Sequence, residues 1–223
     1  MNEENQSTAV ETPPALEPAT RKAVLGAAAR LFVERGYDAV SVREIVKAAG
    51  VTKPALYYYF GSKEGVALAI MRDLMQAADS IRQESFESAR DIRGALVRYV
   101  NGMLAFAAQH KPDLAFGFSC WFGRSSVREL AEKTSEYDCK VNAEWIAFMQ
   151  RRGMEAARAA NLVRVFWALL MQELLRVAHC PRWAGEGEGV AETIAGLALD
   201  GALAWGSEQG GQRTMTSRLG GST

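Results

Sequence analysis

The chain has 223 residues, 48% of them hydrophobic, which suits one medium-sized domain or a small domain joined to a larger one. Its 26 basic and 26 acidic residues balance to a net charge of zero, so any sign of a charged partner has to come from their distribution. No apolar stretch approaches the ~18 residues of a membrane span, and the three scattered cysteines form no CxxC pattern. A reducing compartment, the cytoplasm, is therefore the expected location.

Residues 1–19 form an acidic arm with four glutamates, three prolines and no lysine or arginine. This composition is typical of a disordered segment, and it lacks the basic start and apolar run of a signal peptide. Residues 20–65 hold eight basic and four acidic residues, whereas residues 66–223 are neutral. A basic module on a neutral body indicates a polyanionic partner.

Beyond the arm, long stretches rich in Ala, Leu, Arg, Glu and Met, without an alternating strand pattern, predict an all-α fold. Thr20 can cap the first helix, and Gly36 stands where a left-handed stop is expected. The apolar residues of this helix fall on one stripe: Val24, Leu25, Ala28, Leu31 and Phe32.

Two short helices are predicted next. Ser41 and Glu44 have the spacing of a capping box, and Val40 with Ile45 can form the hydrophobic staple around it. Small residues at 48–50 then allow a tight turn between two crossing helices.

The following helix has equally clear limits. Thr52 is its expected N-cap, and Pro54 lies in the first turn, where an N–H would have no helical partner. Gly61 ends the helix, and Ser62 can cap a fourth, longer one.

Four consecutive aromatic residues occupy the end of this helix, although a helix has only one inward face. With Leu56 inward, Phe60 at i+4 is inward too. A step of about 100° per residue turns Tyr57 and Tyr58 away from that line and leaves Tyr59 on a flank.

Two helices of about eight residues, joined by a small-residue turn and supported by a third, describe a helix-turn-helix. The outward edge of its second helix carries Lys53, Tyr57 and Tyr58, with backbone amides exposed at Thr52. Such an edge can enter a major groove while amides and lysines hold phosphates. The alternative is that the tyrosines are half-buried packing and the lysines ordinary solvated charges.

The segment "AARLFVERGYDAVSVREIVKAAGVTKPALYYYFGSKEGV" resembles the tetracycline-repressor (TetR) family of bacterial transcriptional regulators. Its pieces F..RGY, SVREIVKAAGV and LYYYFGSKE lie at the family's spacing, and the resemblance covers roughly residues 20–70. It implies an all-helical homodimer whose two helix-turn-helix heads bind a palindromic operator. It also implies that a small molecule in the C-terminal domain changes the separation of the heads.

The resemblance assigns DNA contacts residue by residue. Lys63 matches a phosphate-binding lysine at the start of the fourth helix, and Tyr59 stands where many relatives carry histidine. Lys53 and Tyr57 could reach base edges, although this helix offers no arginine fork for guanine. The predicted DNA-binding set is Ser41, Val42, Arg43, Thr52, Lys53, Pro54, Ala55, Tyr57, Tyr58, Tyr59 and Lys63.

The C-terminal half is predicted to be helical, with breaks near residues 90, 111, 123, 153 and 181. Residues 162–180 form a strongly apolar helix, and residues 190–206 carry small residues that allow close helix contact. Such a pair can form a four-helix dimer interface with its twin, which the resemblance also implies. The alternative is that both helices are ordinary monomer core.

An effector pocket is predicted from aromatic and methionine residues that recur along the later helices. These side chains suit a largely apolar or aromatic ligand, although similar stripes also form plain cores. The predicted set is Phe116, Phe118, Trp121, Phe122, Trp145, Phe148, Met149, Phe166, Trp167 and Met171. The isolated His110 and His179 are interpreted as helix-end or surface residues. A redox role for Cys120 stays open, because only Arg124 is near it in sequence.

Catalytic motifs such as G-x-S-x-G, H-E-x-x-H or a phosphate-binding glycine loop are absent from the sequence, and two histidines cannot assemble a histidine-rich metal site. No enzymatic activity, metal or cofactor is expected.

The sequence predicts a dimeric, ligand-responsive transcriptional repressor. The alternatives are an activator or ligand-independent regulator of the same fold, or a small-molecule-binding or interaction protein whose head no longer contacts DNA. The predicted domains are an arm (1–19), a helix-turn-helix domain (20–65), a ligand-binding and dimerisation domain (66–207) and a flexible tail (208–223).

Overall fold

The computed structural model describes residues 18–122, 128–179 and 189–201, and these residues form helices and short connections without any strand. The predicted all-α fold is therefore confirmed. In the described segments, no helix is both long and apolar enough to cross a membrane. The predicted tail, and the predicted arm up to residue 17, lie outside the described residues. The helices are α1 (Pro18–Arg35), α2 (Val42–Ala49), α3 (Lys53–Phe60), α4 (Lys63–Ser88), α5 (Ile92–Gln109), α6 (Lys111–Phe122), α7 (Arg128–Arg151), α8 (Ala156–His179) and a last one over 190–201.

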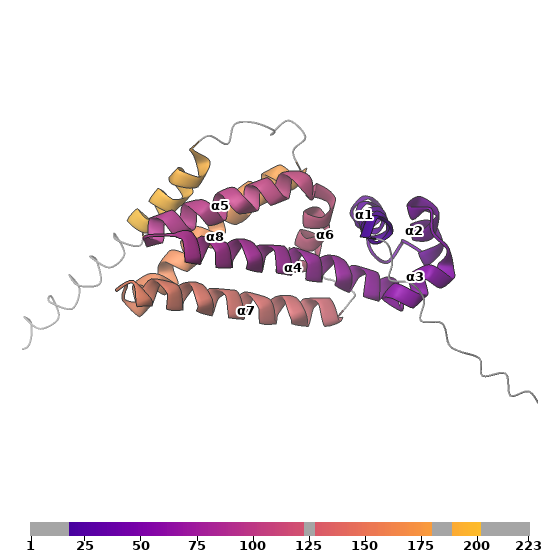
Figure 1. The fold of residues 1–223 in the computed structure, drawn as a ribbon, viewed down its shortest axis with the longest axis horizontal. Helices are drawn as coiled ribbons and strands as arrows, with labels where there is room; N and C mark the ends of the chain where they lie inside the picture. Colours follow the sequence, from indigo (N-terminus) through magenta and orange to yellow (C-terminus); the bar gives the residue numbers. More distant parts are fainter. Residues whose placement is uncertain (1–17, 123–127, 180–188, 202–223) are drawn as a thin grey trace, which may run out of the picture.

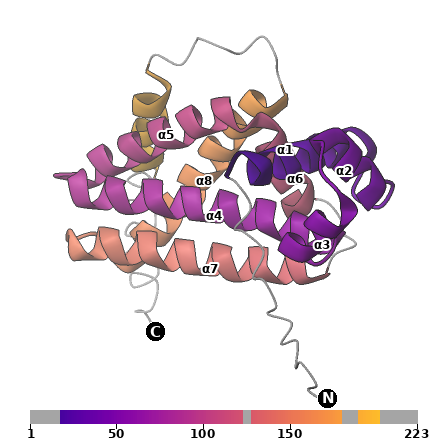
Figure 2. The ribbon, with the colours of Figure 1, turned by 45° about the vertical axis from the view of Figure 1, so that its right-hand side comes forward.

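The helices divide into a small head and a larger body (Figure 1). Helices α1, α2 and α3 form the head, and α4 starts beside them and runs on through the body next to α7 (Figure 2). Helix α5 packs on α4 along the side away from α7, α8 packs against α5, α6 and α7, and α6 fills the space between α1 and the rest of the body. The predicted domain border at residue 65 falls within the first turn of α4, so one continuous helix joins head and body.

Local hydrogen bonds fix where the head helices begin. The Ser41 hydroxyl accepts the amide of Glu44 at 3.3 Å, and the Glu44 carboxylate accepts the amide of Ser41 at 2.9 Å, which confirms the capping box. These bonds from Ser41, together with Arg35, lower the pKa of Glu44 to about 2. The described part of helix α1 starts at Pro18, so Thr20 lies inside the helix and the prediction that it is the N-cap is wrong. Proline is tolerated there because the first N–H groups of a helix have no helical acceptor.

The same chemistry repeats at α3 and α4. Thr52 accepts the amide of Ala55 at 3.4 Å, and Ser62 accepts the amide of Gly65 at 2.9 Å. Helix α2 ends at Gly50, whose φ of 69° is the left-handed conformation that glycine adopts without strain. The lengths of the two short helices are therefore set by residues at their own ends.

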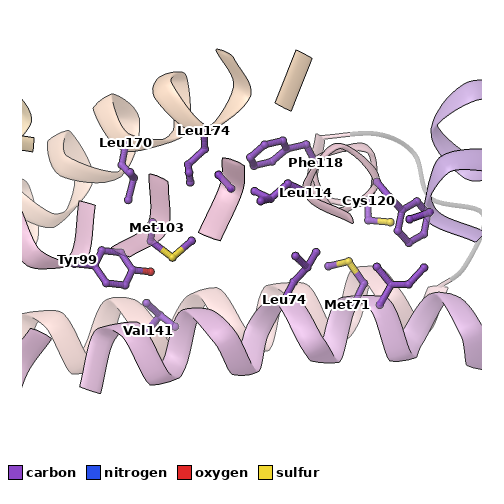
Figure 3. Close-up of a cluster of buried hydrophobic side chains, with 14 of the residues drawn as sticks. Met71, Leu74, Tyr99, Met103, Leu114, Phe118, Cys120, Val141, Leu170 and Leu174 are labelled. Atoms are coloured by element: carbon purple, nitrogen blue, oxygen red, sulfur yellow. The ribbon is translucent and has the colours of Figure 1, made fainter. Parts of the chain in front are cut away.

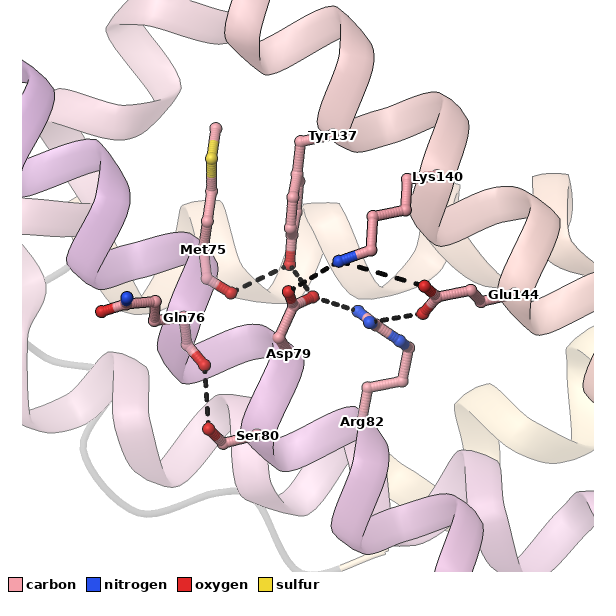
Figure 4. A network of polar contacts seen from close by, with 8 residues as sticks. All are labelled: Met75, Gln76, Asp79, Ser80, Arg82, Tyr137, Lys140 and Glu144. Carbon is pink, nitrogen blue, oxygen red and sulfur yellow. Dashed lines mark hydrogen bonds and ion pairs between the residues drawn. The ribbon is translucent and has the colours of Figure 1, made fainter.

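A partly buried ionic network joins α4 to α7 (Figure 4). The Arg82 side chain, only 5% exposed, lies 2.6 Å from Asp79 and 2.5 Å from Glu144 of α7. Lys140 lies 3.1 Å from Asp79, and the Tyr137 hydroxyl is within 3.0 Å of the same carboxylate. Two cations thus face two carboxylates, so the charges of this site balance.

We expect Arg82→Ala to lower the free energy of unfolding by about 3 kcal/mol, because it leaves two carboxylates without their buried cation. Lys140→Ala is the matched control: its side chain is 53% exposed, and its loss should cost less than about 1 kcal/mol. Urea unfolding followed by circular dichroism measures both values. Equal losses in the two variants would contradict the dominant role given to Arg82.

Candidate nucleic-acid interface and ligand cavity

Helix α3 presents aromatic side chains to solvent. Tyr57 is 50% and Tyr58 54% exposed, whereas Leu56 is 1% exposed. Phe60 is partly buried against the core, and Tyr59, also partly buried, packs edge-to-face on Tyr58 with ring centroids 4.9 Å apart. The predicted facing of the four aromatics is confirmed.

The other residues of the predicted DNA-binding set surround the same edge. Lys53 and Arg43 are exposed and form no ion pair within the described part of the chain, so their charges are available to a partner. Ser41, Thr52 and Pro54 are also exposed, and Val42 and Ala55 are partly buried.

Lys63 differs from the rest of the set because its ammonium already has partners. It donates to the carbonyl of Tyr37 at 2.9 Å and lies 3.5 Å from the carbonyl of Asp38. It also lies over the Tyr37 ring, 4.2 Å from the centroid. Lys63 therefore holds the α1–α2 connection against the start of α4. An ammonium has three N–H donors, so one donor remains for a phosphate.

A close backbone approach fixes α3 on α4. A Cβ atom on Gly65 would lie 1.7 Å from the carbonyl oxygen of Phe60, the last residue of α3. Only glycine allows the two helices to meet at this distance. The direction in which Tyr57 and Tyr58 point is thereby tied to the axis of α4.

A cavity of about 360 Å³ lies among helices α4 to α8 of the body. Figure 3 shows part of its surroundings: Leu74 rises from α4 toward Leu114 and Phe118 of α6, while Tyr99 and Met103 approach from α5. Its aromatic lining comes from four helices and comprises Tyr99, Phe106, Phe118, Trp121, Tyr137 and Trp167. This volume and lining are typical of a small-molecule site.

The structure brings four of the ten predicted pocket residues to this cavity: Phe118, Trp121, Trp167 and Met171. Five others are buried away from its lining, namely Phe116, Trp145, Phe148, Met149 and Phe166. The side chain of Phe122 lies outside what the structure describes.

The five buried residues belong to the closed core, where they pack against other side chains. Phe86 stacks on Phe148 with centroids 4.1 Å apart and meets Trp145 edge-on at 4.6 Å. Phe116 instead packs against Phe32 of α1 at 5.0 Å. Aromatic composition alone therefore does not separate cavity lining from closed core.

Sequence reasoning missed the lining contributed by α4, α5 and α7. A usable signal was the i, i+4 spacing of Tyr99 with Met103 and of Tyr137 with Val141, which marks the inward faces of two helices. It also missed Asp138, the only charged residue among the described lining residues.

Asp138 has one hydrogen-bond partner in the described parts of the chain. The Trp121 indole N–H donates to its carboxylate at 3.2 Å. The residue as a whole is exposed, but partial burial of its carboxylate raises the pKa of Asp138, and this hydrogen bond offsets only part of the effect. Its charge is therefore less well solvated than in water.

Cys120 is buried, and burial raises the pKa of its thiol to about 11. The thiol is thus protonated at neutral pH, which disfavours the redox role left open by the sequence. His110 ends α5 and lies 3.2 Å from Asp113, and His179 ends α8, so both are helix-end residues as predicted. No cluster of metal-binding side chains occurs within the described ranges.

Comparisons with known proteins agree with this architecture. Residues 24–70 match the family model "Bacterial regulatory proteins, tetR family". The chain is 42% identical over 191 residues to the HTH-type transcriptional regulator BetI of Rhizobium meliloti, covering 83% of this chain and 77% of that protein. It is 32% identical over 103 residues to the uncharacterized HTH-type transcriptional regulator YdgC of Bacillus subtilis, covering 44% of this chain and about half of that relative, 53%. The crystal structure of the TetR family regulator PfmR from Thermus thermophilus superposes with a TM-score of 0.61 at 25% identity, covering 80% of this chain and 95% of that one.

We expect Gly65→Ala to lower the free energy of unfolding by about 1–3 kcal/mol, because the new methyl group meets a backbone carbonyl that cannot rotate away. Gly26→Ala in α1 is the matched control, since its nearest neighbour would be the end of the Arg30 side chain at 3.6 Å. That variant should be neutral or stabilised by up to about 1 kcal/mol. Thermal unfolding of both variants measures the difference, and a fully stable Gly65→Ala protein would refute the close approach.

Proposed function

The chain belongs to the tetR family of bacterial regulatory proteins, and on that premise we propose that it is a repressor that binds operator DNA as a homodimer. A small molecule in the body cavity releases it from the DNA. The observation that carries the proposal is the exposed edge of α3, where Lys53, Tyr57 and Tyr58 face solvent on a capped helix. A protein that acts on bacterial operators works in the cytoplasm, which is the location we propose.

In this function α3 enters the major groove and the start of α2 lies along the sugar-phosphate backbone. The hydroxyls of Tyr57 and Tyr58 and the exposed amides at Thr52 position the head on phosphates. These contacts provide affinity with little sequence information. Lys53 is placed to reach base edges at the first turn of α3, and so carries part of the sequence preference.

The C-terminal helices support the homodimer. In the described parts of the body, the exposed large apolar side chains are Val165 of α8 and Leu197 of the last helix. The small residues Ala195 and Ala198 are turned inward and fully buried in their own subunit, so Leu197 is left on the outer face. A matching copy of this surface would bury both exposed side chains around a two-fold axis. Residue 180 and residues 202–206 of the predicted interface segments lie outside the described residues.

Helix α6 supplies a route from the cavity to the head. On one side it lines the cavity with Phe118 and Trp121, and on another Phe116 packs against Phe32 of α1. Helix α1 is also tied to α4 by the bidentate Arg21–Asp73 pair, at 2.6 and 2.8 Å. A ligand that displaces α6 would therefore shift α1 and α4 together. In a dimer this movement changes the separation of the two heads.

We also propose residue 65 as the border between the two functional parts. Residues 20–65 then form the DNA-binding unit, and the following residues up to 207 form the effector and dimerisation unit.

Fluorescence anisotropy tests the proposal directly. The purified full-length chain is titrated onto DNA from upstream of its own gene and onto scrambled DNA of equal length, at a series of salt concentrations. Tight, salt-dependent binding that prefers the upstream fragment supports an operator-binding regulator. Equal, weak binding to both fragments would favour an interaction protein whose head no longer selects DNA.

We expect Tyr58→Ala to weaken binding to upstream and scrambled DNA alike by about fivefold, the effect of losing one hydrogen bond of about 1 kcal/mol. Lys53→Ala should weaken binding to upstream DNA about tenfold more than binding to scrambled DNA, because a base contact is lost. Arg98→Ala, which removes an exposed charge from α5 in the body, is the matched control. It should change neither the affinity for upstream DNA nor the affinity for scrambled DNA. If Tyr58→Ala unfolds the head instead, the outward role of Tyr58 is wrong.

We expect Leu197→Arg to convert the dimer into a monomer at micromolar concentration, because it places a charge in an apolar interface. Val33→Arg is the matched control, since Val33 is 43% exposed but lies on α1 of the head. Sedimentation equilibrium gives the mass of each variant. A Leu197→Arg protein that stays dimeric would place the interface elsewhere.

A further inference from the structure

We propose that the body cavity binds a largely apolar ligand with one positive charge, an amine or quaternary ammonium compound. Its cationic group would lie beside Asp138 and its apolar part among the aromatic walls. The inference rests on the proposed function, because it names the chemical class of the effector for the same cavity.

The charge of the cavity lining is the first argument. Among the described lining residues Asp138 is the only charged side chain, and none is a lysine, arginine or histidine. Its carboxylate accepts a hydrogen bond from Trp121 at 3.2 Å but has no cationic partner in the described parts of the chain. A partly buried carboxylate with a single neutral donor is stabilised by an approaching cation.

The neighbouring charges do not supply that cation. Behind the Tyr137 side of the cavity, Arg82 and Lys140 are both engaged with Asp79 and Glu144. That network is balanced, because Arg82 and Lys140 face Asp79 and Glu144 (Figure 4). The unbalanced negative charge at the cavity is therefore that of Asp138.

The aromatic walls are the second argument. Six aromatic side chains line the cavity, and Trp121 holds the Asp138 carboxylate with its N–H while its ring also lines the cavity. Aromatic faces attract cations through the negative potential of the ring, most strongly for tryptophan. A site that combines a carboxylate with such rings favours a weakly hydrated organic cation over a metal ion, which requires several oxygen ligands.

The remaining polar groups weigh against an anionic ligand. The Tyr137 hydroxyl is committed to Asp79 and to an α4 carbonyl at 3.1 Å, and the Trp121 N–H is committed to Asp138. An anion would find the Trp167 N–H, which has no acceptor within the described ranges, together with the Asn142 amide and the Tyr99 hydroxyl, but these donors are neutral and the anion would also face the charge of Asp138. The volume of about 360 Å³, the space of about a dozen water molecules, admits one small aromatic or alkyl group with its charged end.

The experiment compares three probes that share one phenylbutyl part and differ in charge: 4-phenylbutyl trimethylammonium, 4-phenylbutanol and 5-phenylpentanoate. Isothermal titration calorimetry measures each on the purified full-length protein in the absence of DNA. We expect the cation to bind about tenfold or more tightly than the alcohol, and the anion to bind least.

Asp138→Asn is the decisive variant, because the amide oxygen can still accept the Trp121 hydrogen bond while the charge is lost. It should weaken the cation by about five- to tenfold and leave the alcohol unchanged. Glu136→Gln is the matched control: it removes an exposed carboxylate of α7 that does not line the cavity, and should alter neither affinity. Thermal unfolding of both variants establishes that they are folded.

The inference is overturned if the alcohol or the anion binds as tightly as the cation, if Asp138→Asn keeps the preference for the cation, or if no probe binds. These outcomes are separate from the test of DNA binding, which uses no probe. A regulator that prefers its upstream DNA but binds the alcohol best would retain the proposed function and lose this inference. If the protein binds the cation through Asp138 but binds no DNA, this inference is retained and the proposed function is lost.

Discussion

The contact between the carbonyl of Phe60 and the backbone of Gly65 fixes the orientation of α3 relative to α4, and thereby relative to the body. It seats the last turn of α3 against the first turn of α4, at a distance that any side chain would prevent. Because α4 continues through the body, the exposed face of α3 has a fixed direction relative to helices far from the head. Lys63 adds to this by tying the loop before α2 to the same turn of α4.

The body uses α4 in a second way. Leu74 of α4 lines the cavity, and Asp79 and Arg82, one and two turns further along, hold it to α7 through a balanced ionic network. The cavity thus lies beside a helix that is held firmly at one end and carries the head at the other. Helix α6 completes the arrangement, since it touches both the cavity and α1.

The head could be predicted almost completely from sequence. The capping box of Ser41 and Glu44, the cap at Thr52 and the stop at Gly61 each depend on residues within four positions of one another. The outward direction of Tyr57 and Tyr58 then follows from helix periodicity once Leu56 is placed in the core. Only the start of α1 was displaced, because a first-turn proline and a threonine cap are both compatible with a helix start.

The cavity was decided by tertiary structure. Trp145 and Trp167 look equivalent in sequence, yet Trp145 is closed in by Phe86 and Phe148 while Trp167 lines the cavity. Which aromatic borders a gap depends on how five helices distant in sequence fit together, and no local pattern carries that information. The same holds for Asp138, which faces the cavity beside Trp121, a residue of another helix that donates a hydrogen bond to its carboxylate. The sequence by itself determined the helices, their caps and the exposed edge of α3, because these depend on near neighbours. Only the packing of the body decided where the cavity lies and which charge faces it.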